Sequence, residues 1–453
     1  MTETKKTIIF AGVAVCLALL AFIFAPEKIT PDAFLDQGEA FFPDFKNPNE
    51  ATTLEVVEFD EETGSPKAFK VTFKDGRWTI PSHHNYPADG KDRLAKTAAG
   101  VIGIVKDDFR TDNVSDYEAL GVIDPLKETT GLKGLGKRVT IKGEGEKVLA
   151  DFIIGKKIER RPNMRFVRIP NQKRVYAARM DIDISTNFAD WIDTDLLQLN
   201  KDNIKTVALN NYTINEQTRS VSRHDNVELK LDGNRWKAKG MKSNQQVDST
   251  AIDTLLSTLD ELTIVGVRPK PAGLSASLKQ DKGTSNISQS DARSLQNKGY
   301  YFTGDGEMLS NEGELLIHTS KGISFTLRFG EVVYGSGLAV TAGSNKKAGE
   351  TQTGAASQNR YLFVSAKFNE NTFHEPPKPS NTTFLKMDDS LWTDKQKENK
   401  SLYDAHNKWK RKVENGQNTA QELNNRFADW YFVISNDSFE KLHLSRNKLG
   451  FAE

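Results

Sequence analysis

The sequence predicts an α+β protein: a module of antiparallel strands and hairpins with one packing helix, present in two copies and preceded by one transmembrane helix. Three observations predict this architecture. An apolar run lies near the N-terminus, a strand–turn–tryptophan motif occurs twice, and further motifs follow both occurrences in the same order. Alternation of apolar and polar residues at period 2 indicates half-buried strands, and an apolar stripe at helical spacing indicates an amphipathic helix.

The N-terminal segment has two lysines followed by an uninterrupted apolar run from Thr7 to Ala25. A helix of this length, at about 1.5 Å per residue, nearly crosses the hydrocarbon core of a bilayer. The run is longer than the apolar core of a signal peptide, and Pro26 follows it where a small residue would favour cleavage. We therefore expect residues 1–25 to be a cytoplasmic tip and an uncleaved transmembrane anchor, in contact with the membrane through residues 7–25.

The charges that flank this helix predict its orientation. Lys5 and Lys6 precede it, and the positive-inside rule places such a flank in the cytoplasm. No second run is long enough to span a bilayer, so we expect a single-pass protein of the inner (cytoplasmic) membrane with the bulk of the chain in the periplasm. Cys16 lies in the run without the small residue that precedes an acylated cysteine, which favours a membrane-helix residue over a lipoprotein site.

The composition excludes several classes of protein. The chain has 453 residues with 62 Lys and Arg against 61 Asp and Glu, so it lacks the basic surplus of a nucleic-acid binder. A single cysteine excludes an intramolecular disulfide and a cysteine-rich zinc site. The length suffices for two or three domains, each with its own core.

An internal repeat predicts the two modules. FKVTFKDGRW (Phe69–Trp78) is matched by VELKLDGNRW (Val227–Trp236), and a helix is expected after each, capped by Asp89 and by Asp248. Three further pairs of motifs follow in the same order, so a duplication is the simplest explanation. They are Val139–Lys157 with Leu315–Val333, Arg165–Pro170 with Arg360–Ser365, and FADW at Phe188–Trp191 and Phe427–Trp430, with a strand expected after each FADW at 204–209 and 439–444.

The predicted domain layout follows from this repeat. Four prolines among acidic and aromatic residues make 26–50 a proline-rich stalk. Residues 51–203 are the first α+β module, and 204–453 are the second. The second copy is expanded by inserts near 275–299, 339–359 and 369–424, of which the first two are polar and are expected to be mobile loops.

The third insert is predicted to contain a charged helix. Its apolar stripe recurs at helical spacing and is surrounded by lysines and an arginine. Such a stripe docks on a partner helix or a lipid surface, or it lies on its own domain, which is the favoured interpretation. The stripe consists of Leu402, His406, Trp409 and Val413.

One stretch of each copy carries a resemblance to a known family. The stretch Ile80–Pro125, directly after KDGRW, resembles the bacterial family known as domain of unknown function 4340, and Asp232–Ser275 is similar to the same pattern. The resemblance implies anchoring by one N-terminal helix and an association of some members with ABC-transporter components of the gliding-motility type. The family has no assigned catalytic residues, so the resemblance implies none here.

Histidine and aspartate groups were considered as metal or acid–base sites. His83 and His84 are adjacent, so their side chains diverge, unlike an i, i+4 metal pair, and a structural role is favoured. An acidic run offers oxygen ligands for Ca²⁺ but lacks the glycine-bearing loop of an EF-hand, which favours solvated or helix-capping roles. This run consists of Asp181, Asp183, Asp190, Asp193 and Asp195.

Basic and glycine-rich segments are the other candidates. Gly131, Gly134 and Gly136 lack P-loop spacing and are interpreted as an ordinary loop. A basic series on a predicted hairpin presents a face to anionic lipid headgroups or an acidic partner, or forms solvated strand edges that deter aggregation. It consists of Lys156, Lys157, Arg160, Arg161, Arg165, Arg168, Lys173 and Arg174.

Tryptophan positions favour structural roles. Four of the six occupy duplicated positions, where a copied core residue is expected, namely Trp78, Trp236, Trp191 and Trp430. Trp392 and Trp409 lie in the third insert and are less constrained.

The sequence therefore favours a membrane-anchored extracytoplasmic binding or accessory protein, auxiliary to an ABC-transporter-type or envelope complex, and not an enzyme. No catalytic, cofactor-binding or metal residue is assigned, and no cofactor is expected. One alternative is an envelope hydrolase with a carboxylate-lined cleft between the two copies, for which Asp181, Asp183 and His83 are the first candidates. The other is a purely structural scaffold. The partner and any small-molecule ligand stay open.

Overall fold

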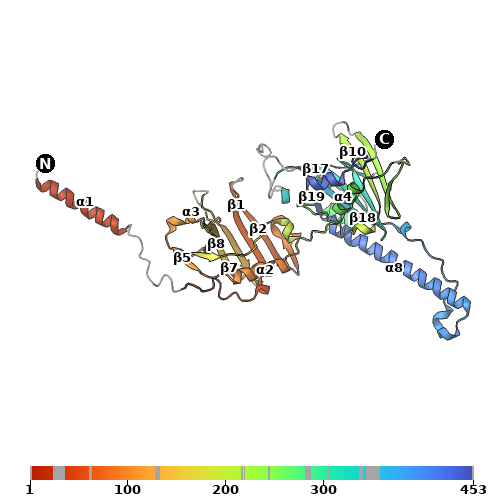
Figure 1. Cartoon of the computed structure of the whole chain (residues 1–453), viewed down its shortest axis with the longest axis horizontal. Helices are drawn as coiled ribbons and strands as arrows, with labels where there is room; N and C mark the ends of the chain where they lie inside the picture. Colours follow the sequence, from red (N-terminus) through yellow and green to blue (C-terminus); the bar gives the residue numbers. More distant parts are fainter. Residues whose placement is uncertain are drawn as a thin grey trace. The chain divides into compact units, whose positions relative to one another are not determined.

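A computed structural model of the chain (Figure 1) describes residues 3–23, 36–60, 64–127, 133–215, 218, 220–242, 245–280, 287–303, 306–335, 340–342 and 358–450. The chain divides into two compact units. Unit 1 comprises Met1–Lys70 and Lys91–Ile184, and unit 2 comprises Val71–Gly90 and Ser185–Glu453. The predicted boundary between modules at 203/204 stays a prediction, although each unit is built around its own antiparallel sheet.

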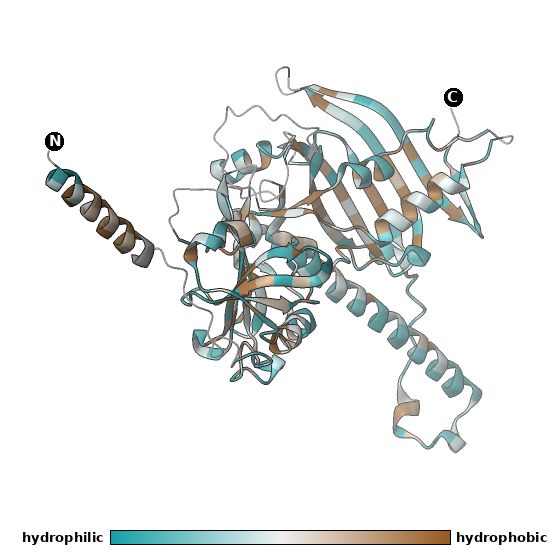
Figure 2. Cartoon of the chain, turned by 60° about the vertical axis from the view of Figure 1, so that its left-hand side comes forward, coloured by the Kyte–Doolittle hydropathy of each residue, from teal (hydrophilic) through white to brown (hydrophobic). Residues whose placement is uncertain are grey.

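The N-terminal helix α1 runs from Glu3 to Ile23. Figure 2 shows a hydrophilic first turn followed by mostly hydrophobic residues along the coloured part of the helix. Across the described part of the chain, no helix has both the length and the apolar character needed to cross a membrane. The transmembrane helix predicted over residues 7–25 is therefore not supported, and positions 24 and 25 lie outside the described residues.

Within the described residues, the first sheet has nine strands in the order β4-β3-β2-β1-β6-β7-β8-β9-β5. Alternating apolar residues bury one face, as in the β1–β6 register of Leu54 with Ile141 and Val56 with Val139, all fully buried. The strands are β1 (Thr53–Asp60), β2 (Ser65–Lys74), β3 (Arg77–Ile80), β4 (Tyr86–Pro87), β5 (Asp108–Thr111), β6 (Lys137–Lys142), β7 (Val148–Ile158), β8 (Arg161–Arg168) and β9 (Val175–Arg179).

Helix α2 (Lys91–Ile102) carries the apolar stripe predicted for the first copy, because Leu94, Ala98 and Val101 are buried. Asp89 lies two residues before its first residue rather than at the cap. The short helix α3 (Tyr117–Leu120) ends at Gly121, which has a positive φ of 70°.

Residues 36–50 correct the stalk prediction in part. Phe41 and Phe45 are buried, and the backbone at Ala40 forms a bridge with Val105. This part of the predicted stalk is therefore packed into unit 1, and residues 26–35 lie outside the described residues.

The second sheet, as far as the structure describes it, has the order β12-β11-β10-β16-β17-β18-β19-β13, and β14 pairs with β15 beside it in the sequence. Its strands are β10 (Ile204–Asn215), β11 (Ser220–Asp232), β12 (Arg235–Ala238), β13 (Gly266–Pro269), β14 (Tyr300–Phe302), β15 (Met308–Ser310), β16 (Glu314–Thr319), β17 (Ile323–Val333), β18 (Asn359–Phe368) and β19 (Trp430–Ile434).

Unit 2 has more helices than the single packing helix predicted for each copy. Asp248 caps α4 as predicted, since its side chain accepts from the backbone N–H groups of Thr250 and Ala251 at 2.8 and 3.2 Å. The helices are α4 (Ser249–Asp260), α5 (Ala272–Lys279), α6 (Gln289–Gln296), α8 (Asp394–Ala428) and α9 (Asn436–Leu442). The insert at 275–299 is thus largely helical where it is described, and most of 339–359 lies outside the described residues.

The two sheets share one topology. When β1 is aligned with β10, the order β3-β2-β1-β6-β7-β8-β9-β5 becomes β12-β11-β10-β16-β17-β18-β19-β13, strand for strand. A duplicated module would produce this correspondence, so it supports the predicted duplication. Two sequence matches were nevertheless wrong. FADW is a 3₁₀ turn at Phe188–Trp191 but runs from α8 into β19 at 427–430, and the strand expected at 439–444 is largely helix α9.

A glycine bulge recurs at the same place in both sheets. The β7–β8 register slips between Ile154 and Lys157, around Gly155, and the β17–β18 register slips between Phe329 and Val332, around Gly330. A Cβ on Gly155 would lie 2.6 Å from the Leu120 carbonyl oxygen, and one on Gly330 would lie 2.2 Å from that of Lys298. Each glycine therefore lets a chain segment cross the sheet in direct contact with a strand.

An arginine fixes each bulge from the neighbouring strand. Nη1 of Arg165 donates to the carbonyl oxygen of Gly155 at 3.3 Å, and Nη1 of Arg360 donates to that of Gly330 at 2.8 Å. These arginines begin the two motifs that the sequence comparison paired.

Helix α8 confirms the charged helix predicted in the third insert. Its C-terminal part buries Ala420, Leu423 and Phe427 and packs on β18, while its N-terminal part extends away from that sheet (Figure 1). The predicted stripe is half-buried and contacts the segment that precedes the helix, where Trp409 Nε1 donates to the carbonyl oxygen of Phe373 at 3.1 Å. The stripe therefore lies on its own domain.

We predict that filling either bulge destabilises the fold. Gly155→Ala and Gly330→Ala place a methyl group against a backbone carbonyl oxygen of the crossing segment, which is held in place by the fold. Each substitution should therefore lower the free energy of unfolding, measured by chemical denaturation, by about 1–3 kcal/mol. Gly103→Ala is the matched control, because its nearest contact would be an ordinary 3.5 Å. Equal stability of all three variants would contradict the assigned role of the bulges.

Candidate functional site

The basic series at 156–174 divides into cations that bind the protein's own oxygens and cations that face solvent. Arg168 is only 4% exposed. Its Nε and Nη2 donate to the carbonyl oxygen of Val122 at 3.1 and 3.0 Å, and Nη1 donates to those of Pro170 and Gln172 at 2.8 and 3.2 Å. Burial lowers the pKa of Arg168. This arginine is structural, since it ties two loops to β8.

Arg174 fastens the segment that begins at Asp36 to the sheet of unit 1. Nε and Nη2 donate to the two carboxylate oxygens of Asp112, both at 3.1 Å, and these hydrogen bonds raise the pKa of Arg174. Nη1 lies 3.7 Å from Asp36, whose carboxylate also accepts from the hydroxyl of Tyr176. Burial tends to raise the pKa of Asp36, but the hydrogen bonds from Tyr176 and Lys106 lower it below its ordinary value.

The end of the β7–β8 hairpin carries three of the cations that face solvent. Lys157, Arg160 and Arg161 are exposed, and we call these three residues the basic tip. None of them forms an ion pair with another described residue; the guanidinium of Arg161 donates to the sulfur of Met164, at 3.8 Å. Arg160 has a positive φ of 63° at the turn, and Glu159 beside it is the one acidic residue there.

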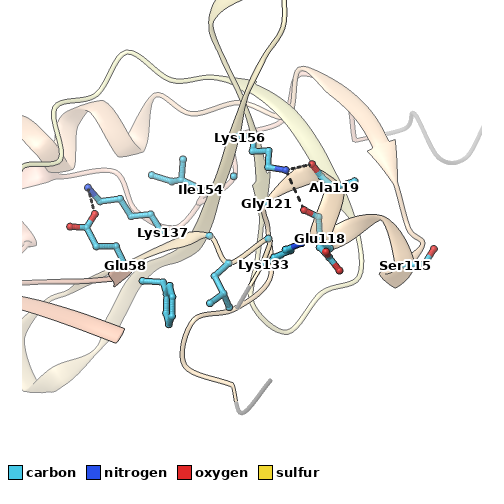
Figure 3. A pocket seen from close by; sticks show the side chains of 14 residues that line it. Glu58, Ser115, Glu118, Ala119, Gly121, Lys133, Lys137, Ile154 and Lys156 are labelled. Carbon is cyan, nitrogen blue, oxygen red and sulfur yellow. Dashed lines mark hydrogen bonds and ion pairs between the residues drawn. The ribbon is translucent and has the colours of Figure 1, made fainter. Parts of the chain in front are cut away.

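An open hollow of about 780 Å³ lies in unit 1 next to this hairpin (Figure 3). Its lysines are Lys133, Lys137 and Lys156. The Lys137 ammonium pairs with Glu58 at 3.5 Å, and the Lys156 ammonium donates to the carbonyl oxygen of Ala119 at 2.9 Å. The rest of the lining is Phe59, Ser115, Glu118, Gly121, Gly134, Leu135, Gly136, Ile154 and Gly155.

The glycines of this hollow provide close packing. A Cβ on Gly134, which has a φ of 74°, would lie 2.4 Å from Cα of Glu118, and one on Gly136 would lie 2.8 Å from the carbonyl oxygen of Gly121. They let the loop pair with the chain after α3 through the bridge of Ile123 with Leu135. Gly131 lies outside the described residues.

The hollow has the chemistry of a binding surface. Its described lining contains no histidine or cysteine, and no hydrogen bond joins the hydroxyl of Ser115 to another lining residue. Lysines and glutamates beside small apolar patches favour a polar, charged ligand without supplying a nucleophile–base pair.

His83 and His84 are held by hydrogen bonds within unit 2. His83 is buried, its Nδ1 and Nε2 lie 3.0 Å from the hydroxyls of Ser82 and Thr341, and its ring stacks on Phe188 at 4.6 Å. Nε2 of His84 lies 2.6 Å from the carbonyl oxygen of Ala342. These contacts account for both side chains in structural terms.

The acidic run forms caps and ion pairs. Asp183 pairs with Arg93 at 2.8 Å, and Asp193 pairs with Arg426 at 3.0 Å. Asp190 accepts from Ser185, and Asp195 accepts from the backbone N–H of Gln198. Across the described ranges, no group of three or more His, Cys, Asp or Glu could hold a metal ion. Of the hydrolase candidates, Asp181 and Asp183 belong to unit 1 and His83 belongs to unit 2.

The tryptophans make internal contacts. Trp191 is fully buried, and its Nε1 donates to the carbonyl oxygen of Ser185 at 3.0 Å. Trp430 packs edge-on against Tyr86 at 5.0 Å. Trp392, for which the sequence favoured no structural role, donates to the carbonyl oxygen of Met387.

The sequence reasoning missed a buried lysine in unit 2. Lys270 Nζ donates to the carbonyl oxygen of Phe427 at 2.8 Å and lies 4.2 Å from the ring centroid of Phe363. Burial lowers the pKa of Lys270 to about 7, although the negative charge of Asp429 opposes the shift. The signal in the sequence was Arg268 and Lys270 directly after the apolar run Ile264–Val267.

Comparison with known proteins gives one family match. The model of a family described as "Domain of unknown function (DUF4340)" matches residues 78–279. The match supports the resemblance seen in 80–125 and 232–275, whereas α1 and everything after 279 lie outside the matched range. No curated protein and no solved structure matches the chain.

We predict that Lys270 makes stability depend on pH. Because its pKa is about 7 in the folded protein and its ordinary value is 10.5, the unfolded chain binds more protons between these limits, so stability rises as pH increases from 7 toward 9. Its share of the slope is at most about 1.4 kcal/mol per pH unit. Denaturation across this range should show a flatter profile for Lys270→Met than for the wild type, while Lys279→Met, beside the same Asp429, serves as control. Identical slopes for wild type and Lys270→Met would refute the assignment.

Proposed function

We propose that this chain is a single-pass, membrane-anchored binding or accessory protein whose two units work outside the cytoplasm, auxiliary to a membrane transport or envelope complex. The observation that carries the proposal is the surface of α1. Large apolar side chains there are 49–73% exposed, at Ile8, Ile9, Phe10, Val13, Val15, Leu17, Leu19 and Leu20.

These side chains cover every side of the helix. Consecutive residues of an α-helix point about 100° apart, so Ile8, Ile9 and Phe10 alone face three directions. A helix that packs on its own protein keeps one polar face, whereas a helix that is apolar all round is suited to lipid. At about 1.5–3 kcal/mol per large apolar side chain, transfer of this set into hydrocarbon favours membrane insertion by more than about 10 kcal/mol.

The charges of the first turn support the proposed orientation. Lys5 and Lys6 lie at the N-terminal end of α1, with Glu3 paired to Lys6 at 3.3 Å. The positive-inside rule then puts this end in the cytoplasm and units 1 and 2 on the other side of the inner membrane.

The two units support a binding role over catalysis. The hollow of unit 1 offers lysines, glutamates and apolar patches, and two of the residues considered for hydrolysis, Asp183 and His83, are engaged in structural contacts. The shared strand order supports two copies of one α+β module, as the repeat predicts. The family resemblance makes a transporter of the ABC type the first complex to test.

We expect α1 to determine where the protein is found. Val13→Asp combined with Leu17→Asp places two carboxylates in the apolar stretch and should move most of the protein from carbonate-washed membranes to the soluble fraction. The double variant Val148→Asp and Val221→Asp is the matched control, because it replaces two apolar residues that are exposed in units 1 and 2.

Proteins that co-purify with the full-length chain in detergent, and not with the α1 variant, identify the complex. Recovery of wild-type protein in the soluble fraction would refute the anchor, and recovery from membranes without any partner after crosslinking would refute the accessory role.

A further inference from the structure

The basic tip is a part of unit 1 where three positive side chains lie close together without a described carboxylate partner. Lys157, Arg160 and Arg161 face solvent at the end of β7 and β8, and none pairs with a described carboxylate. The other arginines of the same series bind internal oxygens, as Arg168 and Arg174 do. The fold therefore satisfies some cations of this series and leaves three together at one hairpin end.

The hairpin holds the tip in a fixed position. Arg165, opposite Lys157 in the register, donates to the carbonyl oxygen of Gly155 at the bulge, and the Lys156 ammonium donates to that of Ala119. These bonds tie the two strands to each other and to helix α3 just before the tip begins. Three cations on such a support lose little conformational freedom when they meet a charged surface.

The chain between α1 and the sheet of unit 1 is short. After α1, which ends at Ile23, the next described residue is Asp36, which Arg174 and Tyr176 bind to the sheet. The thirteen residue-to-residue links from Ile23 to Asp36 span at most about 45 Å when fully extended. If α1 is inserted in a bilayer, unit 1 cannot leave its surface, so a weak contact with that surface acts at high effective concentration.

We propose that the basic tip binds the anionic headgroups of phospholipids in the membrane that holds α1, so that unit 1 docks on the bilayer by this hairpin. The proposal rests on the proposed function, because it takes the membrane contact of α1 as given. Each Lys or Arg close to an anionic surface strengthens binding about fivefold, so the three together contribute about a hundredfold.

A lipid surface fits the tip better than an acidic protein does. The three cations lie at an exposed turn with Pro162 and Asn163, which are also exposed. The hollow that would accommodate a protein side chain is lined by Gly155 and Lys156, and none of the three tip residues lines it. An exposed, positively charged turn is attracted to a flat array of phosphates by charge alone. Glu159, at the same turn, weakens the attraction without cancelling it.

The experiment uses the full chain in nanodiscs. A Cys16→Ser, Asn163→Cys protein carries an environment-sensitive dye beside the tip, and a quencher is attached to lipid headgroups. The discs contain phosphatidylcholine alone or an equal mixture of phosphatidylcholine and phosphatidylglycerol. We expect strong quenching only in the anionic discs, and we expect added salt to reduce it because the attraction is screened.

Neutralisation of the tip gives the decisive comparison. Lys157→Gln, Arg160→Gln and Arg161→Gln together should reduce quenching in anionic discs to the level seen in neutral ones. The matched control removes the same charge from exposed positions of α8, by Lys408→Gln, Lys410→Gln and Arg411→Gln, and should leave quenching unchanged. Quenching that does not depend on lipid charge, or that both triple variants lose equally, would overturn the proposal, as would a tip bound only to a co-purifying acidic protein.

Failure of the anchor is distinguishable from failure of the tip. A chain that enters neither type of disc contradicts the proposed function. In that case co-sedimentation with anionic vesicles still tests the tip: loss of binding in the tip variant supports the proposal, and equal binding of both triple variants overturns it.

Discussion

The close crossing of a chain segment over a strand glycine is the constraint on which both sheets depend. At Gly155 and at Gly330 the absence of a side chain allows a carbonyl-bearing segment to lie directly on the strand, and the bulge turns the glycine's own carbonyl toward an arginine of the next strand. The segment that crosses, the end of the hairpin and the hollow of unit 1 all take their positions from this contact. Since the same glycine, bulge and arginine occur at one place in two sheets of equal strand order, they form the strongest structural argument for duplication.

Much of this fold could be predicted, because the signals were local. Alternation in Phe69–Trp78 and Val227–Trp236 gave strands that pair as hairpins, and Asp248 caps its helix through its own side chain. The errors came from segments that depend on tertiary contacts. A literal FADW repeat has no fixed structure of its own, so one copy became a 3₁₀ turn and the other joined a helix to a strand. Residues 36–50 were interpreted as part of a stalk because prolines favour an extended chain. In the structure, however, Phe41 and Phe45 are buried in the core of unit 1.

The candidate site was harder to predict, because charge in a sequence does not reveal which cations are used internally. The series at 156–174 was recognised as basic, but only the structure separates Arg168, which donates to four carbonyl groups, from Arg160, which binds none that is described. The hollow depends on Gly121, Gly134 and Gly155, which come from three separate segments and therefore leave no local motif. Lys270 was missed for a similar reason: its burial is created by Phe363 and Phe427, which are distant in sequence.

The distribution of cations connects the fold to the proposed membrane location. A protein with a net charge of +1 gains no attraction to a membrane from its charge as a whole, so any electrostatic contact must come from local asymmetry. Burying Arg168 and pairing Arg174 removes two cations from the surface, whereas Lys157, Arg160 and Arg161 stay exposed at one end of a hairpin. A short connection to an apolar helix then makes a small number of charges sufficient, because a tethered unit needs only a weak interaction to hold one orientation. In this arrangement the orientation of unit 1, rather than its attachment, is what the basic tip controls, which is why neutralising it should change quenching near the hairpin and leave the chain in the membrane.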